Sequence, residues 1–149
     1  MKFGGTSVGS PDRMKNVASL IKQYAKHVDA LLSTPEHRET MRAFLIDEFN
    51  YLRSFTKDLF TSFEEKSIVA QGEVISTNMM VNYLQEIGVK AVLLNALDFM
   101  RTDKNNEPDL AFIRENLNRL MEENKGYQIY ITQGFICKNA YGETDNLLR

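Results

Sequence analysis

The sequence predicts an α/β fold in which helices cover a mostly parallel sheet. Three observations lead to this prediction. Each of the three prolines stands where a segment with helical periodicity begins. Two short apolar runs in the second half have the length and composition of buried parallel strands. A segment with helical periodicity separates the two runs, which is the order of a right-handed strand–helix–strand crossover.

The first half of the chain is predicted to be helical. Proline suits the first turn of a helix, and behind both Pro11 and Pro35 apolar residues recur at three- and four-residue steps. A third apolar segment ends at Gly88, where a left-handed C-terminal cap belongs. The predicted helices cover about 11–26, about 35–62 and Ser67–Ile87.

The second half is predicted to hold two strands around a fourth helix. Glu107-Pro108-Asp109 opens this helix and Gly126 ends it. From Gln133 onward the residues are polar and glycine-containing, so a loop is expected after the second strand. The predicted strands are Val89–Leu94 and Tyr127–Thr132.

Composition excludes several classes of protein. A length of 149 residues fits one domain, and 18 basic against 20 acidic side chains give no basic face for nucleic acid or an anionic membrane. We find no run long enough to span a membrane and no signal peptide at the N-terminus, so a cytoplasmic protein is expected. One cysteine, Cys137, and two scattered histidines, His27 and His37, exclude a disulfide scaffold and make a poor zinc set.

The N-terminal segment Lys2-Phe3-Gly4-Gly5-Thr6-Ser7 has the features of a phosphate-binding loop. Glycines let backbone N–H groups approach an anion, the following helix contributes its positive N-terminus, and Lys2 adds a full charge. The segment matches neither the Walker A pattern nor the dinucleotide fingerprint Gly-x-Gly-x-x-Gly. Taken alone, it is slightly better explained as an ordinary glycine turn between a strand and a helix.

Four segments together resemble aspartate kinases, the aspartokinase branch of the amino-acid kinase family. KFGGTSVG, at the N-terminus, resembles the opening motif of these enzymes, and the other three follow in the family's order. This resemblance implies a three-layer sandwich of the amino-acid kinase type. The similar segments are Ala70–Thr77, containing Gly-Glu-x-x-Ser; Met100-Arg101-Thr102 with Glu107-Pro108-Asp109; and Ile131–Ile136, containing TQGFI.

The resemblance implies transfer of the ATP γ-phosphoryl group to the side-chain carboxylate of L-aspartate. The products would be 4-phospho-L-aspartate and ADP, at the first step of lysine, threonine and methionine biosynthesis, with ATP and Mg²⁺ as cofactors. A carboxylate with a reference pKa of about 3.9 is already ionised at neutral pH, so the reaction needs no general base. Catalysis then depends on aligning the two anions and neutralising the charge of the transferring group.

The family pattern assigns the phosphate-binding roles to the N-terminal loop. Lys2 is the expected catalytic residue, because its ammonium would stabilise the transferring phosphoryl group together with magnesium and backbone N–H groups. Gly4, Gly5 and Thr6 are expected to hold the phosphates with it. No residue is assigned as a protein ligand of a metal ion. Capping of the following helix is an alternative explanation for Thr6.

Three further residues match substrate-binding positions of the family. Glu73 would meet the α-ammonium group of aspartate, although a glutamate in the first turn of a helix is also stabilised by the helix dipole. Ser7 matches a substrate-facing hydroxyl, or it caps a helix. Arg149 matches the arginine that would meet the substrate α-carboxylate, but Leu147-Leu148 before it differs from the family context.

Other reactive side chains receive structural interpretations. Cys137 has no neighbouring base and is expected to be an incidental thiol, and His37 is expected to be solvated. A conformational role is at least as well supported as a catalytic one for Arg101 and Thr102. The apolar residues of 44–63 predict core packing and a subunit contact, as in a homodimer.

Two departures from the family pattern suggest that the chain is partial. The interval from Tyr24 to Thr34 leaves no room for the strand and substrate loop that aspartokinases carry there. Either this variant has lost them or an internal segment is missing near residues 24–34, and we favour the missing segment. The ATP-binding half and the ACT regulatory domains would follow Arg149. Residues 1–149 are therefore interpreted as part of the N-terminal portion of a catalytic domain. The alternatives are an inactive fragment, a non-catalytic module that binds substrate or a partner chain, or an amino-acid kinase with another acceptor.

Overall fold

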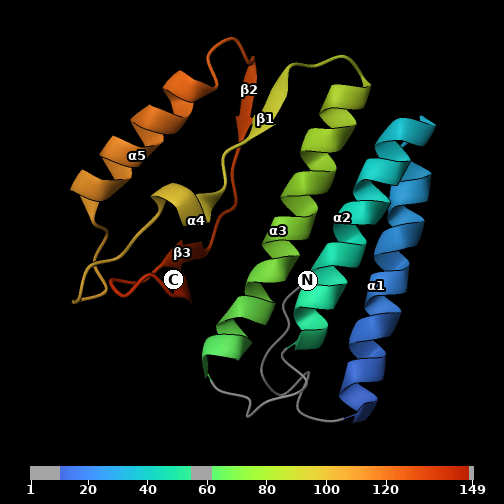
Figure 1. Cartoon of the computed structure of the whole chain (residues 1–149), viewed down its shortest axis with the longest axis horizontal. Helices are drawn as coiled ribbons and strands as arrows, with labels where there is room; N and C mark the ends of the chain where they lie inside the picture. The colour runs from blue at the N-terminus through green and yellow to red at the C-terminus, as the bar shows by residue number, and fades with distance from the viewer. Residues whose placement is uncertain (1–10, 55–61, 148–149) are drawn as a thin grey trace.

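The computed structural model of the chain describes residues 11–54 and 62–147. Figure 1 shows three long helices side by side next to a smaller unit of strands and helices, and the predicted α/β class is confirmed. The elements in chain order are α1 Pro11–Leu31, α2 Pro35–Ser54, α3 Ser62–Glu86, β1 Ala91–Leu93, α4 Ala96–Phe99, α5 Leu110–Glu123, β2 Ile129–Ile131, β3 Ile136–Lys138 and β4 Thr144–Asn146.

Two of the prolines begin helices as predicted, and several helix bounds differ. Pro11 opens α1 and Pro35 opens α2, whereas Pro108 precedes the N-cap of α5, Asp109, whose side chain accepts a hydrogen bond from the backbone N–H of Phe112 at 3.1 Å. The described part of α2 ends at Ser54, and Ser62, which we assigned to the second helix, belongs to α3.

The helices α1, α2 and α3 share one buried core. α2 lies between α1 and α3 and packs against both (Figure 1). Partly buried aromatic residues and Met79 surround this core, so the three helices form one layer. Its buried members are Val28, Leu32, Met41, Leu45 and Ile75.

The junction between α1 and α2 is a closed, hydrogen-bonded turn. α1 continues to Leu31, beyond its predicted end, so the described residues 24–34 form helix and turn with no strand. The Glu86 carboxylate at the end of α3 accepts hydrogen bonds from the backbone N–H groups of Ser33 at 2.7 Å and Thr34 at 2.6 Å. Arg38 donates to the Leu32 carbonyl oxygen at 2.6 Å. The expected absence of an internal segment at this point stays a prediction, and the backbone N–H groups of Leu32, Ser33 and Thr34 all have hydrogen-bond partners in the turn.

The second half contains the predicted crossover. β1 and β2 are parallel, with Ala91 opposite Ile129 and Leu93 opposite Ile131. In Figure 1, α5 lies on one side of this pair and α3 on the other, and α3 packs against β1. The strands are shorter than the apolar runs that predicted them.

A short loop follows β2 as predicted, over residues 132–135, but the hairpin that comes after it was not predicted. β3 and β4 form an antiparallel hairpin in which Ile136 lies opposite Asn146 and Lys138 opposite Thr144. The side chain of Asn139 accepts hydrogen bonds from the backbone N–H groups of Tyr141 and Glu143 and closes the turn. Each strand has three residues with polar members, so no alternating pattern marks it in the sequence.

Candidate functional site

The structure describes one of the predicted site residues, Glu73. It lies on α3, partly exposed, well beyond the first turn of a helix that begins at Ser62. The alternative explanation of Glu73, stabilisation by the helix dipole, is therefore wrong, because the effect of the dipole falls off within the first turn of a helix. Burial, and after it the negative charge of Glu73, raise the pKa of Tyr24 on α1. The remaining predicted residues lie outside the described ranges: Lys2, Gly4, Gly5, Thr6, Ser7 and Arg149.

Three segments that resemble the family meet at one place in the fold. Ala70 on α3, Ala96 at the start of α4 and Ile136 on β3 form one buried cluster. Leu97, Met100 and Phe135 pack against it. The helix, the turn after β1 and the segment after β2 are therefore held against one another by apolar packing.

Gln133, in the TQGFI segment, joins the same elements through hydrogen bonds. Its side chain is 4% exposed. Its amide oxygen accepts from the backbone N–H of Ala96 at 2.8 Å, and its amide nitrogen donates to the Thr77 hydroxyl oxygen at 3.0 Å. The Thr77 hydroxyl donates in turn to the backbone carbonyl of Glu73 at 2.8 Å. A chain of hydrogen bonds thus connects the segment after β2 with the backbone of Glu73.

The same segment contains an unusual backbone conformation. Phe135 has a φ of 70°, and the backbone N–H of Ile136 donates to the Gly134 carbonyl oxygen at 2.9 Å across it. This γ-turn is strained for a bulky side chain. The Leu147 N–H donates to the Phe135 carbonyl oxygen at 2.7 Å and holds the turn from β4's side. Strained turns of this kind concentrate at functional sites, and the sequence gives no local signal for this one.

Arg101 and Thr102 hold the long loop between α4 and α5. The Thr102 N–H donates to the Lys138 carbonyl at 2.9 Å, which attaches the loop to β3. The Arg101 guanidinium pairs with Asp109 at 2.5 Å and lies 3.7 Å from the centre of the Phe112 ring. Its hydrogen bonds lower the pKa of the Asp109 carboxyl. These contacts favour a conformational role for both residues.

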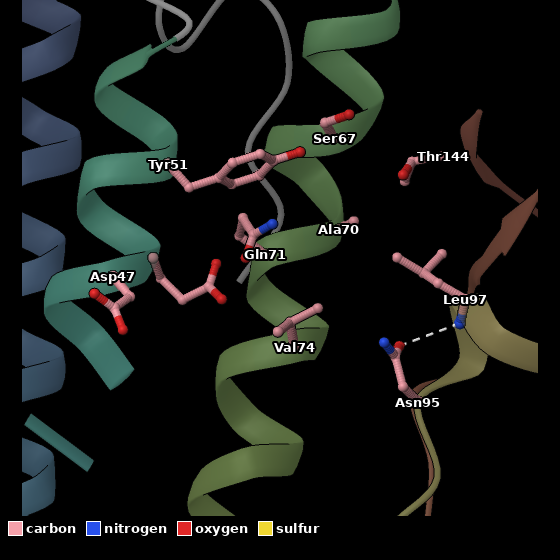
Figure 2. Close-up of a pocket in the computed structure, with 10 residues that line it drawn as sticks. Asp47, Tyr51, Ser67, Ala70, Gln71, Val74, Asn95, Leu97 and Thr144 are labelled. Atoms are coloured by element: carbon pink, nitrogen blue, oxygen red, sulfur yellow. Dashed lines mark hydrogen bonds between the residues drawn. The ribbon is translucent and has the colours of Figure 1, made fainter. Parts of the chain in front are cut away.

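A cavity of about 410 Å³, which we call the α2–α3 cavity, lies beside these segments. Figure 2 shows its labelled side chains entering from α2, from α3 and from the opposite side, where Leu97 and Thr144 lie. Burial, with a contribution from Asp47, raises the pKa of Glu48 on its α2 side. Sequence reasoning missed this cavity, because its described lining residues come from four separate segments. They are Asp47, Glu48, Tyr51, Ser67, Ala70, Gln71, Val74, Asn95, Leu97 and Thr144.

Two other sequence expectations can be compared with the structure. His37 is half-buried and its Nδ1 atom lies 2.5 Å from the side-chain oxygen of Asn82 on α3, so the expectation of a fully solvated residue is corrected. Cys137 is 1% exposed, and burial raises its pKa to about 11, with a smaller contribution from Asp145. Such a thiol is unsuited to nucleophilic chemistry at neutral pH.

Comparison with known proteins gives the family. A sequence model of the amino acid kinase family matches residues 1–149. The chain belongs to the amino acid kinase family. The chain is similar to the bifunctional aspartokinase/homoserine dehydrogenase 2 of Escherichia coli (strain K12), with 24% identity over 130 residues that cover 86% of the chain and 16% of that protein.

Solved structures support the same fold. The structure of E. coli aspartokinase III in complex with aspartate and ADP matches this chain at 24% identity and a TM-score of 0.57. The match covers 99% of this chain and 43% of the aspartokinase III chain. The structure of the aspartate kinase of Clostridium acetobutylicum matches at 15% identity and a TM-score of 0.53, and the match covers 88% of this chain and 31% of the Clostridium chain. The chain thus spans less than half the length of each of these relatives.

Among residues 11–54 and 62–147, no helix is long and apolar enough to cross a membrane. In the same ranges, no group of three or more His, Cys, Asp or Glu side chains is arranged to hold a metal ion.

Proposed function

We propose that this chain is part of an aspartate kinase, which transfers the γ-phosphoryl group of ATP to the side-chain carboxylate of L-aspartate. The observation that carries the proposal is the meeting of three segments that resemble the family: Gln133 donates a hydrogen bond to Thr77, and Met100 packs against the cluster that contains Ala70 and Ile136. The relatives support it, since E. coli aspartokinase III was solved with aspartate and ADP.

Glu73 is the described residue to which we assign substrate recognition. Its partly exposed carboxylate lies on the helix that Gln133 fixes, and a negative charge there suits the α-ammonium group of an amino acid. Substrates of related kinases without an α-ammonium group, such as N-acetylglutamate or UMP, would gain nothing from this carboxylate. Glu73 thus supplies the discrimination in favour of a free amino acid.

The phosphate end of the reaction is assigned to the N-terminal loop. Lys2 would balance the charge of the transferring phosphoryl group, with Gly4, Gly5 and Thr6 holding the phosphates. The hydroxyl group of Ser7 would face the substrate, and Arg149 would meet the α-carboxylate of aspartate. When bound with ATP, Mg²⁺ would neutralise phosphate charge. No described residue is proposed as a magnesium ligand.

An acceptor panel tests the proposal. ADP release is measured with the complete reading frame that contains this chain, using L-aspartate, L-glutamate, N-acetylglutamate and UMP. Of the four acceptors, we expect only L-aspartate to support ADP release. We also expect Glu73→Gln to raise the KM for L-aspartate, whereas the exposed control Glu115→Gln should leave this KM unchanged. Preference for another acceptor would make this a different amino acid kinase.

The 149-residue chain by itself is proposed to turn over little or not at all. It covers 43% of E. coli aspartokinase III and 16% of the bifunctional relative, so much of a nucleotide site of that kind would lie elsewhere. Activity of this chain at the level of the complete reading frame would contradict the interpretation of residues 1–149 as a portion of a catalytic domain. Substrate binding without turnover would agree with it.

A further inference from the structure

We propose that the α2–α3 cavity is a binding site for a small aliphatic molecule carrying a primary ammonium group. The site is proposed to be separate from the kinase chemistry, and Glu73, the described residue assigned to aspartate, is not among its described lining residues. The proposal rests on hydrogen-bond acceptors, charge and apolar surface within the same cavity.

Two buried polar side chains on α3 line the cavity with atoms that have no hydrogen-bond partner among the described residues. They are the Ser67 hydroxyl, in a side chain 1% exposed, and the Gln71 amide oxygen, in a side chain 8% exposed. Folded proteins rarely leave such groups unpaired, so each needs an explanation. An amide oxygen can only accept a hydrogen bond, so the group that would complete Gln71 must be a donor.

The charge of the lining favours a positively charged donor. Asp47 and Glu48 line the α2 side, and none of the described lining residues is a lysine, arginine or histidine. Burial already raises the pKa of Glu48, which shows that its carboxylate is short of solvation. A cation would offset this desolvation, whereas a phosphate or a second carboxylate would be repelled. The side chain of Asn95 is already engaged, because its oxygen accepts from the Leu97 N–H at 3.2 Å.

The apolar part of the lining indicates that the rest of the ligand is aliphatic. Ala70, Val74 and Leu97 supply apolar contacts next to these acceptors, and Figure 2 shows Leu97 facing α3 across the space. An ammonium group has three donors, and a short aliphatic chain matches the apolar part. A volume of about 410 Å³ is within the range of small-molecule sites. Aspartate itself, with two carboxylates, suits this lining poorly.

A titration of the 149-residue chain with 1,4-diaminobutane tests the site by isothermal calorimetry and by amide chemical shifts. Its neutral analogue 1,4-butanediol controls for apolar binding. We expect saturable binding of the diamine, with shifts at Ser67 and Gln71, and none of the diol. Gln71→Met and Glu48→Gln should each weaken binding by about tenfold or more, the usual effect of losing a charge-assisted hydrogen bond. The exposed control Gln23→Met should bind as the native chain does.

Several results would overturn the proposal. Absence of saturable binding would overturn it, and so would equal binding of the diamine and the diol. Equal affinity of the native chain and both cavity variants for the diamine would also overturn it, because that result would indicate a general attraction of cations to an acidic protein. Competition by L-aspartate would place the substrate in this cavity and overturn its separation from the kinase site. Since Gln71→Met removes an unpaired acceptor, we expect it to fold, and Ser67→Ala provides a second variant. No ATP or turnover is needed, so failure of the kinase proposal would leave this test intact.

Discussion

Replacing Gln133 by leucine should cost about 2–4 kcal/mol of folding stability. Gln133→Leu keeps a side chain of similar volume and removes the hydrogen bonds to the Ala96 N–H at 2.8 Å and to Thr77 at 3.0 Å. Each buried hydrogen bond contributes about 1 kcal/mol, and an unpaired buried N–H costs about 1–3 kcal/mol. The unpaired group here is the N–H of Ala96, a residue with no exposed surface. The loss would be a large part of a typical stability of about 5–15 kcal/mol.

Urea unfolding followed by circular dichroism measures this loss. The matched control is Gln128→Leu, because Gln128 is exposed and its side chain accepts a hydrogen bond of 3.3 Å from the Lys90 N–H. The change in the free energy of unfolding should stay within about 0.5 kcal/mol for this variant. In a double-mutant cycle, Gln133→Leu combined with Thr77→Val should cost less than the sum of the two, by about 0.5–3 kcal/mol. Equal effects of the Gln133 and Gln128 changes, or full additivity with Thr77→Val, would refute the inferred coupling.

Two further predictions concern titratable groups. The hydrogen bonds from Thr34 and Ser33 lower the pKa of Glu86 below its usual 4.5, so Glu86 stabilises the fold above that pH and loses this effect as the pH falls. Glu86→Gln should therefore lower the midpoint of thermal unfolding at pH 7, and the difference from the native chain should shrink below pH 4.5; a constant difference would contradict this. Burial raises the pKa of Cys137 from 9.0 to about 11, so its contribution to stability is present below pH 9 and is lost as the pH rises to about 11. At pH 8 a maleimide should label Cys137 about 100-fold more slowly in the native chain than in urea, and equal rates would show that the thiol is accessible.

The sequence predicts those elements whose signals are local. Pro11 and Pro35 mark helix starts because they act within one turn, and the strand–helix–strand unit follows from two apolar runs and a helical period. The β3–β4 hairpin could not be predicted in this way, because its pairing depends on Asn139 closing the turn and on the Lys66–Asp145 ion pair that joins it to α3 at 2.7 Å.

The candidate site was predicted only as far as motifs reach. The Ala70–Thr77 segment and Gln133 are visible in the sequence as resemblances, but the hydrogen bond between Thr77 and Gln133 joins residues that are far apart in the chain. The position of Glu73 within α3 depended on where the helix begins, and that start lies ahead of the apolar segment that predicted it. The α2–α3 cavity arises from packing between elements, which periodicity does not encode.

Trapping of the reaction product with hydroxylamine is the most direct test of the proposed phosphoryl transfer. An acyl phosphate reacts with hydroxylamine to give a hydroxamate, which a simple phosphate ester does not. We predict that the complete reading frame containing this chain, given L-aspartate, ATP and Mg²⁺, forms aspartyl hydroxamate at a rate that depends on both substrates. Absence of the hydroxamate with an otherwise folded protein would contradict the assignment of this chain to an aspartate kinase.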